Sequence, residues 1–425
     1  MSDTSKAPRR GRQTVARHGA LKSPHPLGQL AKIIAICLSV VLVSGLGVAT
    51  YLAYDLTATF SADAVELEGQ EAPPPNIGEI EGGVNLFVAG TDACEPDYAY
   101  LFGDRCEGPD AESELNDVNM LVHISDEPRR VTVISFPRDL MMPIPSCTAE
   151  DGSTTGAMSK QPLNSTFNYG GLSCAAKAVS ELSGQNIQYA ASVTWGGVIE
   201  ITNAIGGVDV CVANGIYDPN TGLDLDPGIH TVAGIEALQF LRTRKGVGDG
   251  SDLGRISNQQ QYMSRLARKL VSEEVLTNPT MLLKLARTAI ENVDPSTSLT
   301  NPLTLVQIAL ALKNVPFEEI VFVQYPTLTD PDNINHVVPN YEAADALWAA
   351  LAANQPLQLT GEAGVNDGVT VVEPTAPPVE PTQPTTEPTP GATVAPAPTE
   401  TAIALPPEIS GSTAAQETCS NGNVR

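Results

Sequence analysis

The chain has 425 residues and contains 49 acidic against 24 basic side chains, which gives a formal net charge of −25 at neutral pH. A surface with so much negative charge repels the phosphate backbone of nucleic acids, so we expect no nucleic-acid partner. Anionic ligands in general are disfavoured unless one local pocket overrides the overall field.

The N-terminal region has the pattern of a membrane anchor. Residues 33–54 are twenty-two residues without a charge, and a helix of this length spans the ~30 Å hydrocarbon core of a bilayer. Residues 1–32 carry seven basic side chains against a single acidic one, which predicts that this tail is cytoplasmic. A signal peptide is the alternative, but the apolar stretch is long for one and no small-x-small cleavage site follows closely. We therefore expect a single-pass protein of the cell membrane whose remaining chain is extracellular.

Two segments without the composition of a core flank the central region. Residues 55–83, which include EAPPPNIGEIEGG, are expected to form an extracellular stalk. Residues 356–425, which include EPTAPPVEPTQPTTEPTPGATVAPAPTE, are expected to form a disordered Pro/Thr-rich tail. The central region, 84–355, is long enough for one substantial domain.

Strand and helix patterns alternate along the central region. The expected strands are 84–90, 120–124, 130–136, 206–212 and 318–325. The expected helices are 174–184, 252–271, 281–293, 302–315 and 340–353. This interleaving predicts an α/β fold, a single domain with a central mixed β-sheet flanked by helices on both faces.

Six of the seven cysteines lie outside the expected membrane span. An even number of cysteines in an oxidising compartment predicts disulfides, and the absence of CxxC pairs argues against zinc. Short loop closure favours the pairs Cys94–Cys106 and Cys147–Cys174. Cys211 and Cys419 remain as a third pair by elimination.

The segment LRTRKGVGDGSDLGRISNQQQ (241–261) is unusually basic for so acidic a chain. Arg242 and Arg244 would share one side of an extended chain, and Arg255 and Gln259 one face of a helix. Guanidiniums held close together repel each other unless an anion lies between them, so the segment indicates a phosphate or pyrophosphate site. The alternative is a solvated loop in which these cations pair with nearby aspartates.

Three more charged residues stand at the ends of expected strands, where α/β folds build their sites. Arg138 follows one strand in SFPRD, Asp92 follows another in GTD, and Asp117 precedes a third in NDVN. Two aspartates at such a place could hold a hard divalent cation such as Mg²⁺, shared with substrate phosphates. Either aspartate alone is more commonly a turn residue.

Taken in order, these motifs resemble the LytR–CpsA–Psr (LCP) family over about residues 84–355. The matching stretches are VNLFVAGTD, NDVNMLVHI, VTVISFPRDL, LNSTFNYGG, EITNAIGGVDVCV, GIEALQFLRTRK and DLGRISNQQ. The resemblance implies that residues 84–355 form the catalytic domain of a membrane-anchored enzyme of Gram-positive-type envelopes. It implies transfer of a polyprenyl-pyrophosphate-linked glycopolymer onto a peptidoglycan hydroxyl, with release of polyprenyl phosphate.

The resemblance also implies roles for individual residues. The residues implied to bind the pyrophosphate are Arg138, Arg242, Arg244, Arg255 and Gln259, and those implied to be catalytic are Arg138, Arg242, Arg244 and Asp117. Asp92 and Asp117 are implied to hold Mg²⁺. The lipid is implied to occupy an apolar slot between sheet and helices, to which residues 189–207 could contribute, although such a segment is more commonly ordinary core.

Four positions depart from the family pattern. Cys94 stands in place of an arginine, Leu115 and Val118 replace an arginine and a threonine, and Pro162 replaces a lysine. Arg105 could substitute for one missing cation. These departures leave two alternatives to a transferase open: a non-catalytic envelope protein that binds polyprenyl-phosphate glycolipid, and a lipid pyrophosphate hydrolase.

Overall fold

The computed structural model describes residues 58, 60–62, 64–71, 83–109, 111, 113–270, 278–364, 366–372 and 401–424. The expected cytoplasmic tail (1–32) and transmembrane helix (33–54) lie outside these residues. Among the helices in the described part of the chain, none combines the length and the apolar character needed to cross a bilayer.

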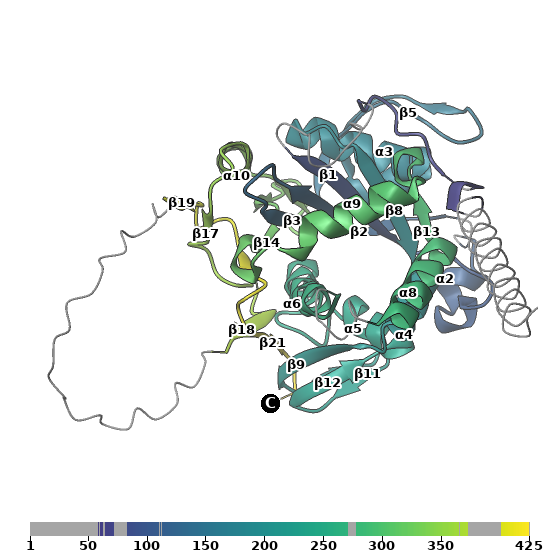
Figure 1. Ribbon diagram of the computed structural model, residues 1–425. Coiled ribbons are helices and arrows are strands. Elements are labelled where there is room, and N and C mark those ends of the chain that lie inside the picture. The colour runs from purple at the N-terminus through teal and green to yellow at the C-terminus, as the bar shows by residue number, and fades with distance from the viewer. Residues whose placement is uncertain are drawn as a thin grey trace, which may run out of the picture. The chain divides into compact units, whose positions relative to one another are not determined.

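A seven-stranded mixed sheet forms the centre of the domain (Figure 1). In spatial order its strands are β13 (Val293–Pro295), β8 (Tyr189–Thr194), β1 (Val84–Thr91), β2 (Asn116–Ile124), β3 (Val131–Phe136), β14 (Ile320–Gln324) and β20 (Gly411–Thr413). β1 is parallel to β8 and antiparallel to β2, and β3 is parallel to β14. Every residue of β3 and β14 is buried, as expected for strands that are covered on both faces.

Helices cover both faces of this sheet. On one face, α3 (Thr166–Ser183) and α10 (Tyr341–Ala352) pack against side chains such as Phe87 and Ile134. On the other face, α6 (Asp252–Leu270) and α9 (Pro302–Lys313) pack against side chains such as Val131 and Val133. Neighbouring residues of β3 thus point to opposite faces, as the two-residue period of a strand requires. The predicted mixed α/β architecture is confirmed.

The sequence did not predict a second, four-stranded sheet. Its spatial order is β12 (Gly228–Val232), β9 (Val208–Asn214), β21 (Thr418–Asn421) and β18 (Val369–Val371). Its apolar face packs against α5 (Gly234–Arg242) and α6 through residues such as Val210, Phe240 and Tyr262. Helix α6 therefore contacts both sheets (Figure 1).

Shorter elements complete the fold. The remaining helices are α2 (Asp104–Glu107), α4 (Trp195–Ala204) and α8 (Pro279–Asn292), with short 3-10 turns at Ala99–Leu101, Leu163–Ser165, Thr297–Leu299 and Phe317–Glu319. The remaining strand pairs are β4 (Met141–Ile144) with β7 (Met158–Pro162), β5 (Cys147–Thr148) with β6 (Thr154–Thr155), β10 (Ile216–Asp218) with β11 (Leu223–Leu225), β15 (Thr327–Thr329) with β16 (Val337–Pro339), and β17 (Leu357–Gln358) with β19 (Ile403–Ala404).

The structure corrects the expectation of a disordered tail over 356–425. Residues 357–358, 369–371, 403–404, 411–413 and 418–421 form strands of the fold, including the interior strand β21 of the four-stranded sheet. The physical reason is that Leu405, Ile409 and Ala414 are fully buried in the domain core. Residues 373–400, which carry most of the Pro/Thr-rich stretch, lie outside the described residues.

The expected stalk over 55–83 is also corrected in part. Val65 and Leu67 pack against the core, and Val65 forms a bridge with Ser296. The backbone N–H of Glu68 donates to Ser173 Oγ at 2.8 Å. Residues 64–71 therefore belong to the domain, because Val65 and Leu67 are partly buried against its core.

All three expected disulfides are formed. They join Cys94 to Cys106, Cys147 to Cys174, and Cys211 to Cys419. The last pair closes 208 residues of sequence and fixes β21 beside β9. Its C-terminal partner was expected in a disordered tail, so this bond explains why that part of the chain is folded.

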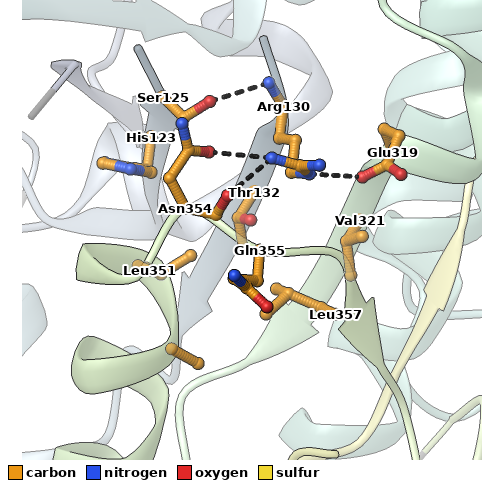
Figure 2. Close-up of a pocket in the computed structure, with 11 residues that line it drawn as sticks. His123, Ser125, Arg130, Thr132, Glu319, Val321, Leu351, Asn354, Gln355 and Leu357 are labelled. Carbon is orange, nitrogen blue, oxygen red and sulfur yellow. Dashed lines mark hydrogen bonds and ion pairs between the residues drawn. The ribbon is translucent and has the colours of Figure 1, made fainter. Parts of the chain in front are cut away.

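A small pocket at one edge of the main sheet is structural. Figure 2 shows Arg130 bonded to Glu319 and Asn354, which joins β3 to the end of α10. His123 lines the same pocket, and burial lowers its pKa to about 4. The cavity measures about 10 Å³, which is at most the space for one water molecule. It therefore offers no ligand site.

Candidate active site

The charged residues that the sequence predicted for the site lie at the opposite edge of the main sheet. β1 ends at Thr91, which pairs with Asn116 at the start of β2, and β3 ends at Phe136, which pairs with Asn119. The antiparallel register therefore brings Asp92, Asp117 and Arg138 to one edge. The expectation that strand ends would gather these residues is confirmed.

A charged cavity of about 310 Å³ opens at this edge. Its lining residues are Asp117, Arg138, Asp218, Asn220, Thr221, Arg242, Arg244, Lys245 and Arg255. Five cations thus face two carboxylates, on a protein whose net charge is strongly negative. The four predicted arginines and Asp117 meet here, whereas Asp92 and Gln259 do not line the cavity.

Arg138 is held by carboxylates. Its Nη1 donates to Asp117 Oδ1 at 2.8 Å, and its Nε lies 3.3 Å from Asp252 Oδ1. Burial alone would lower the pKa of Arg138, but Asp117, Asp252 and Asp139 together raise it well above its usual value. Arg138 is therefore a permanent and firmly oriented positive charge.

Asp252 connects the arginines to each other. Its Oδ1 lies 2.6 Å from Arg255 Nη2, 3.3 Å from Arg138 Nε and 4.0 Å from Arg244 Nε. It is the first residue of α6, where the helix dipole favours a negative charge. The sequence placed Asp252 at the start of an expected helix, and the structure shows that it is also a buried anchor for three guanidiniums.

Arg255 is the most buried cation of the cluster, with only 6% of its side chain exposed. Burial lowers its pKa, and the charges of Asp252 and Asp117 oppose this effect. Its Nη2 also donates to the backbone oxygen of Asp117 at 3.3 Å. A guanidinium so poorly hydrated interacts strongly with any anion that enters the cavity.

Arg242 is oriented by aromatic rings. Its guanidinium carbon lies 4.0 Å from the centre of the Trp195 ring and 4.9 Å from that of Phe102. Burial lowers the pKa of Arg242, an effect that the charge of Asp117 opposes. Among the described residues, no carboxylate forms an ion pair with it, so its N–H donors are not committed to another side chain.

The backbone around Arg242 differs from the extended chain that the sequence suggested. Arg242 is the last residue of helix α5, and the chain leaves the helix at Thr243. Asp218 fixes this turn: its Oδ2 accepts hydrogen bonds from Thr243 Oγ1 at 2.7 Å and from the backbone N–H of Arg244 at 3.2 Å. Both arginines still line the same cavity.

Asp92 already has a protein cation as its partner. Its Oδ2 accepts a hydrogen bond from Arg105 Nε at 3.0 Å, and its Oδ1 accepts one from the backbone N–H of Leu115 at 2.7 Å. Arg105, suggested as a substitute for a missing cation, thus pairs with Asp92 and is not among the residues that line the charged cavity. Within the described parts of the chain, no three His, Cys, Asp or Glu side chains form a metal-binding group.

An apolar cavity of about 210 Å³ adjoins the charged one. Its walls include residues adjacent in sequence to the charged lining: Val118 follows Asp117, and Leu241 precedes Arg242. Gln259 also lies on this wall, and its Nε2 donates to the backbone oxygen of Leu241 at 2.9 Å. Its amide thus secures α6 to α5, in contrast to the role in pyrophosphate binding that the resemblance implied.

The segment 189–207 contributes to this apolar cavity. Val193, Val198, Ile201 and Ile205 line it, beside residues of α5 and α6. The sequence favoured ordinary core for this segment, with a lipid slot as the alternative. The structure shows strand β8 and helix α4 here, with one side of α4 facing a cavity.

Several residues of the site were missed by sequence reasoning. Asp218 and Lys245 line the charged cavity, and the rings of Phe102 and Trp195 contact the Arg242 guanidinium. The proximity of Lys245 to two arginines was visible in the sequence. The other three carry no local signal, because their role depends on segments that meet only in the folded chain.

Comparisons with known proteins give a consistent picture. Residues 50–353 match the profile of the LytR_cpsA_psr family. The cell wall biosynthesis protein LcpA of Corynebacterium glutamicum is 25% identical over 335 residues, which cover 73% of this chain and 62% of LcpA. The probable cell wall biosynthesis protein LcpB of the same organism is 28% identical over 260 residues, which cover 60% of this chain and 54% of LcpB. The chain thus spans little more than half the length of these two relatives.

Two further comparisons concern a named transferase and a solved structure. The polyisoprenyl-teichoic acid–peptidoglycan teichoic acid transferase TagT of Bacillus subtilis is 23% identical over 313 residues, 72% of this chain and 89% of TagT. The LytR-Csp2A-Psr enzyme from Actinomyces oris superposes with a TM-score of 0.51 at 22% identity, over 68% of this chain and 95% of that structure. The latter likeness shows a shared fold.

Proposed function

The chain belongs to the LytR_cpsA_psr family, and from this premise we propose that it is a cell-wall phosphotransferase. It would move a polyprenyl-pyrophosphate-linked glycopolymer onto a peptidoglycan hydroxyl and release polyprenyl phosphate. Relatives named as teichoic acid transferases support this reaction class. The observation that carries the proposal is the cavity lined by four arginines that adjoins an apolar cavity.

The two cavities match the two parts of such a substrate. A diphosphate diester carries two negative charges, and the charged cavity offers five cations against two carboxylates. Arginine binds phosphate oxygens through two parallel N–H bonds, and these bonds gain strength in a poorly hydrated site. The apolar cavity beside it suits the part of the prenyl chain nearest the pyrophosphate.

The proposed reaction exchanges one P–O bond for another. The acceptor hydroxyl oxygen attacks the phosphorus that bears the glycan, and the bond from that phosphorus to the bridging oxygen breaks. The bond electrons remain on the polyprenyl phosphate, which gains negative charge, and the hydroxyl proton passes to a base. Guanidiniums fixed before the reaction stabilise this growing charge, and removal of one such donor costs about 10²–10³ in rate.

Individual residues have distinct parts in this proposal. Arg242 and Arg244 bind the pyrophosphate from the α5 side of the cavity, and Arg138 and Arg255 from the strand-end and α6 side. Asp117 orients Arg138 through the 2.8 Å hydrogen bond. Asp252 prevents the guanidiniums from repelling each other before substrate binds.

The proposal includes Mg²⁺ through Asp117. Mg²⁺ is commonly held by one or two carboxylates together with substrate phosphates, where it stabilises phosphate charge as a Lewis acid. Asp117 lines the cavity and fits this role. Asp92 fits less well, since Arg105 and the Leu115 N–H already bond to both of its oxygens, whereas the bond from Arg138 to Asp117 involves one oxygen only.

The proposed setting is the outer side of the cell membrane, with residues 33–54 as the anchor and the N-terminus in the cytoplasm. The three disulfides support an oxidising compartment for the domain. The glycopolymer and the peptidoglycan acceptor would both be available there.

The test uses purified full-length protein, a polyprenyl-pyrophosphate-linked glycan, a peptidoglycan acceptor and Mg²⁺. We expect wild-type protein to release polyprenyl phosphate and to form the glycan–peptidoglycan phosphodiester, and Arg242→Ala to lose about 10²–10³ in rate. Arg287→Ala, a change at an exposed residue of α8 that pairs with Glu291, serves as the control. Release without transfer would identify a hydrolase, and binding without turnover a glycolipid-binding protein; either result contradicts the proposal.

A further inference from the structure

We infer that the loop closed by the Cys94–Cys106 disulfide contributes to anion binding by positioning charged side chains of the site. It places the Arg105 guanidinium against Asp92, so that a protein side chain, in place of a metal ion, provides the positive charge next to this carboxylate. It also places Phe102 against Arg242 and so orients the Arg242 guanidinium. Only the kinetic consequences of this inference rest on the proposed function, because its binding consequences can be measured with simple ions.

The loop is attached to helix α4 by specific contacts. Glu95 Oε2 accepts a hydrogen bond from the backbone N–H of Gly196 at 2.7 Å, and the Tyr98 hydroxyl donates to Glu200 Oε1 at 2.5 Å. A Cβ atom at Gly196 would lie 2.4 Å from Glu95 Oε2 and 2.5 Å from the Tyr98 ring. Any side chain at this position would force Glu95 and Tyr98 to move, which shows that the loop and α4 fit each other closely.

Apolar contacts hold the same loop in place. Leu101 and Phe102 pack with Trp195, Ile199 and Leu238 in a small cluster at the junction of α4 and α5. The rings of Phe102 and Trp195 have their centres 4.0 Å apart. Together with the disulfide, these contacts fix the position of the short helix α2, which carries Arg105.

Arg105 neutralises a buried carboxylate. Only 7% of the Asp92 side chain is exposed, and an ionised group so deeply buried needs a partner charge. Arg105 meets this need through Nε on Asp92 Oδ2 at 3.0 Å and Nη2 on the Asp92 backbone oxygen at 3.3 Å. The same Nη2 donates to the backbone oxygen of Ser113, which ties the loop to the segment that precedes β2.

This pairing changes what Asp92 can bind. A divalent cation at Asp92 would have to displace bonds at both carboxylate oxygens, which accept from Arg105 and from the Leu115 N–H, whereas at Asp117 the bond from Arg138 involves Oδ1 alone. The site would therefore hold a divalent cation through Asp117 and the bound phosphates, with Arg105 as the fixed cation at Asp92. Removal of the guanidinium should open Asp92 to metal.

Phe102 acts through Arg242. In the part of the chain that the structure describes, the contacts that orient the Arg242 guanidinium are the faces of Phe102 and Trp195, with no carboxylate bonded to it. The two ring centres are themselves 4.0 Å apart, so the guanidinium lies against both rings from one side, and these contacts orient it while its N–H donors stay available to a ligand. Phe102 is thus a positioning residue for the arginine that ends α5.

The test is a set of matched variants in the full-length protein. Phe102→Leu removes the ring and Phe102→Tyr keeps it; Arg105→Gln removes the charge and Arg105→Lys keeps it; Arg287→Gln is the control. The first probe is inorganic pyrophosphate in metal-free buffer, measured by titration calorimetry. The second probe is Mn²⁺, measured by electron paramagnetic resonance, and melting temperatures confirm that each variant is folded.

We expect Phe102→Leu to weaken pyrophosphate binding about 10-fold, whereas Phe102→Tyr and Arg287→Gln bind like wild type. We expect Arg105→Gln to bind Mn²⁺ at a site that wild type and Arg105→Lys lack. Unchanged pyrophosphate affinity in folded Phe102→Leu, or an unchanged Mn²⁺ titration in folded Arg105→Gln, overturns the inference. Absence of transferase activity alongside the expected binding results would reject the proposed function and support the inference.

Discussion

Replacement of Asp252 with asparagine keeps the shape of the side chain and removes the one carboxylate that three arginines share. In the wild-type protein, 9% of the Asp252 side chain and 6% of the Arg255 side chain are exposed, and the two charges are 2.6 Å apart. Arg138 keeps a second partner in Asp117, and Arg244 is more than one-third exposed. The cost of the change therefore falls mainly on Arg255.

The expected loss in the free energy of unfolding can be estimated from these ion pairs. Breaking a buried ion pair by removal of one partner costs about 3–5 kcal/mol, because the remaining charge stays buried without compensation. The exposed part of the network adds little, since water screens Arg244. We therefore expect Asp252→Asn to lower the free energy of unfolding by about 4 kcal/mol, which corresponds to about 10 °C in the melting temperature of a domain of this size.

The assay is urea unfolding and thermal melting with and without inorganic pyrophosphate. Pyrophosphate restores negative charge among the guanidiniums, so it should raise the melting temperature of Asp252→Asn by more than that of wild type. Glu291→Gln, which breaks an exposed pair with Arg287, is the control and should change neither quantity. A loss of less than ~0.5 kcal/mol, the range of ordinary surface substitutions, would refute the view that Asp252 anchors the cluster.

Four further predictions test other parts of the structure. The folded-state pKa of His123 is lowered by burial to about 4, so the unfolded chain takes up a proton first and stability falls as pH drops from about 6.5 to 4; His123→Gln should flatten this part of the curve, measured by urea unfolding at several pH values. Ile201→Trp fills the apolar cavity and should weaken binding of the lipid-linked substrate while calorimetry shows unchanged affinity for inorganic pyrophosphate. Asp117→Asn removes the proposed metal ligand, so it should lower the transferase activity and also make that activity less dependent on Mg²⁺ concentration. An unchanged dependence on Mg²⁺ would exclude Asp117 as a metal ligand. The double change Cys211→Ser and Cys419→Ser should cost about 2–5 kcal/mol of stability, and chemical denaturation curves that coincide with those of wild type would contradict this.

The sequence predicted the charged half of the site because its signals are local. Arg138 and Asp117 adjoin strands with clear apolar patterns, and strand ends in α/β folds meet at one edge. Arg242 and Arg244 are close in sequence, so their convergence needed no knowledge of the tertiary structure. The helical conformation of Arg242 was missed because the short segment GIEALQFLR can be read as either element.

The rest of the site depends on contacts between distant segments. Phe102 contacts Arg242 only because its loop is attached to α4, and the local sequence has no pattern that predicts this attachment. Asp252 acts as a buried anchor because strand β3 brings Arg138 to it. Strands β20 and β21 have three and four residues, which is too short for a periodic pattern to show.

The place of β21 between β9 and β18 has a consequence for how the protein matures. The disulfide that fixes β21 joins residues 208 positions apart. The four-stranded sheet therefore cannot form completely until β21, which is synthesised long after β9, pairs with it. Topologies with such distant partners fold slowly. Until that strand arrives, α6 lacks Glu417 as the acceptor for Arg265 and Arg268. The four-stranded sheet that packs against α6 can therefore be completed only after residues 418–421 have been synthesised.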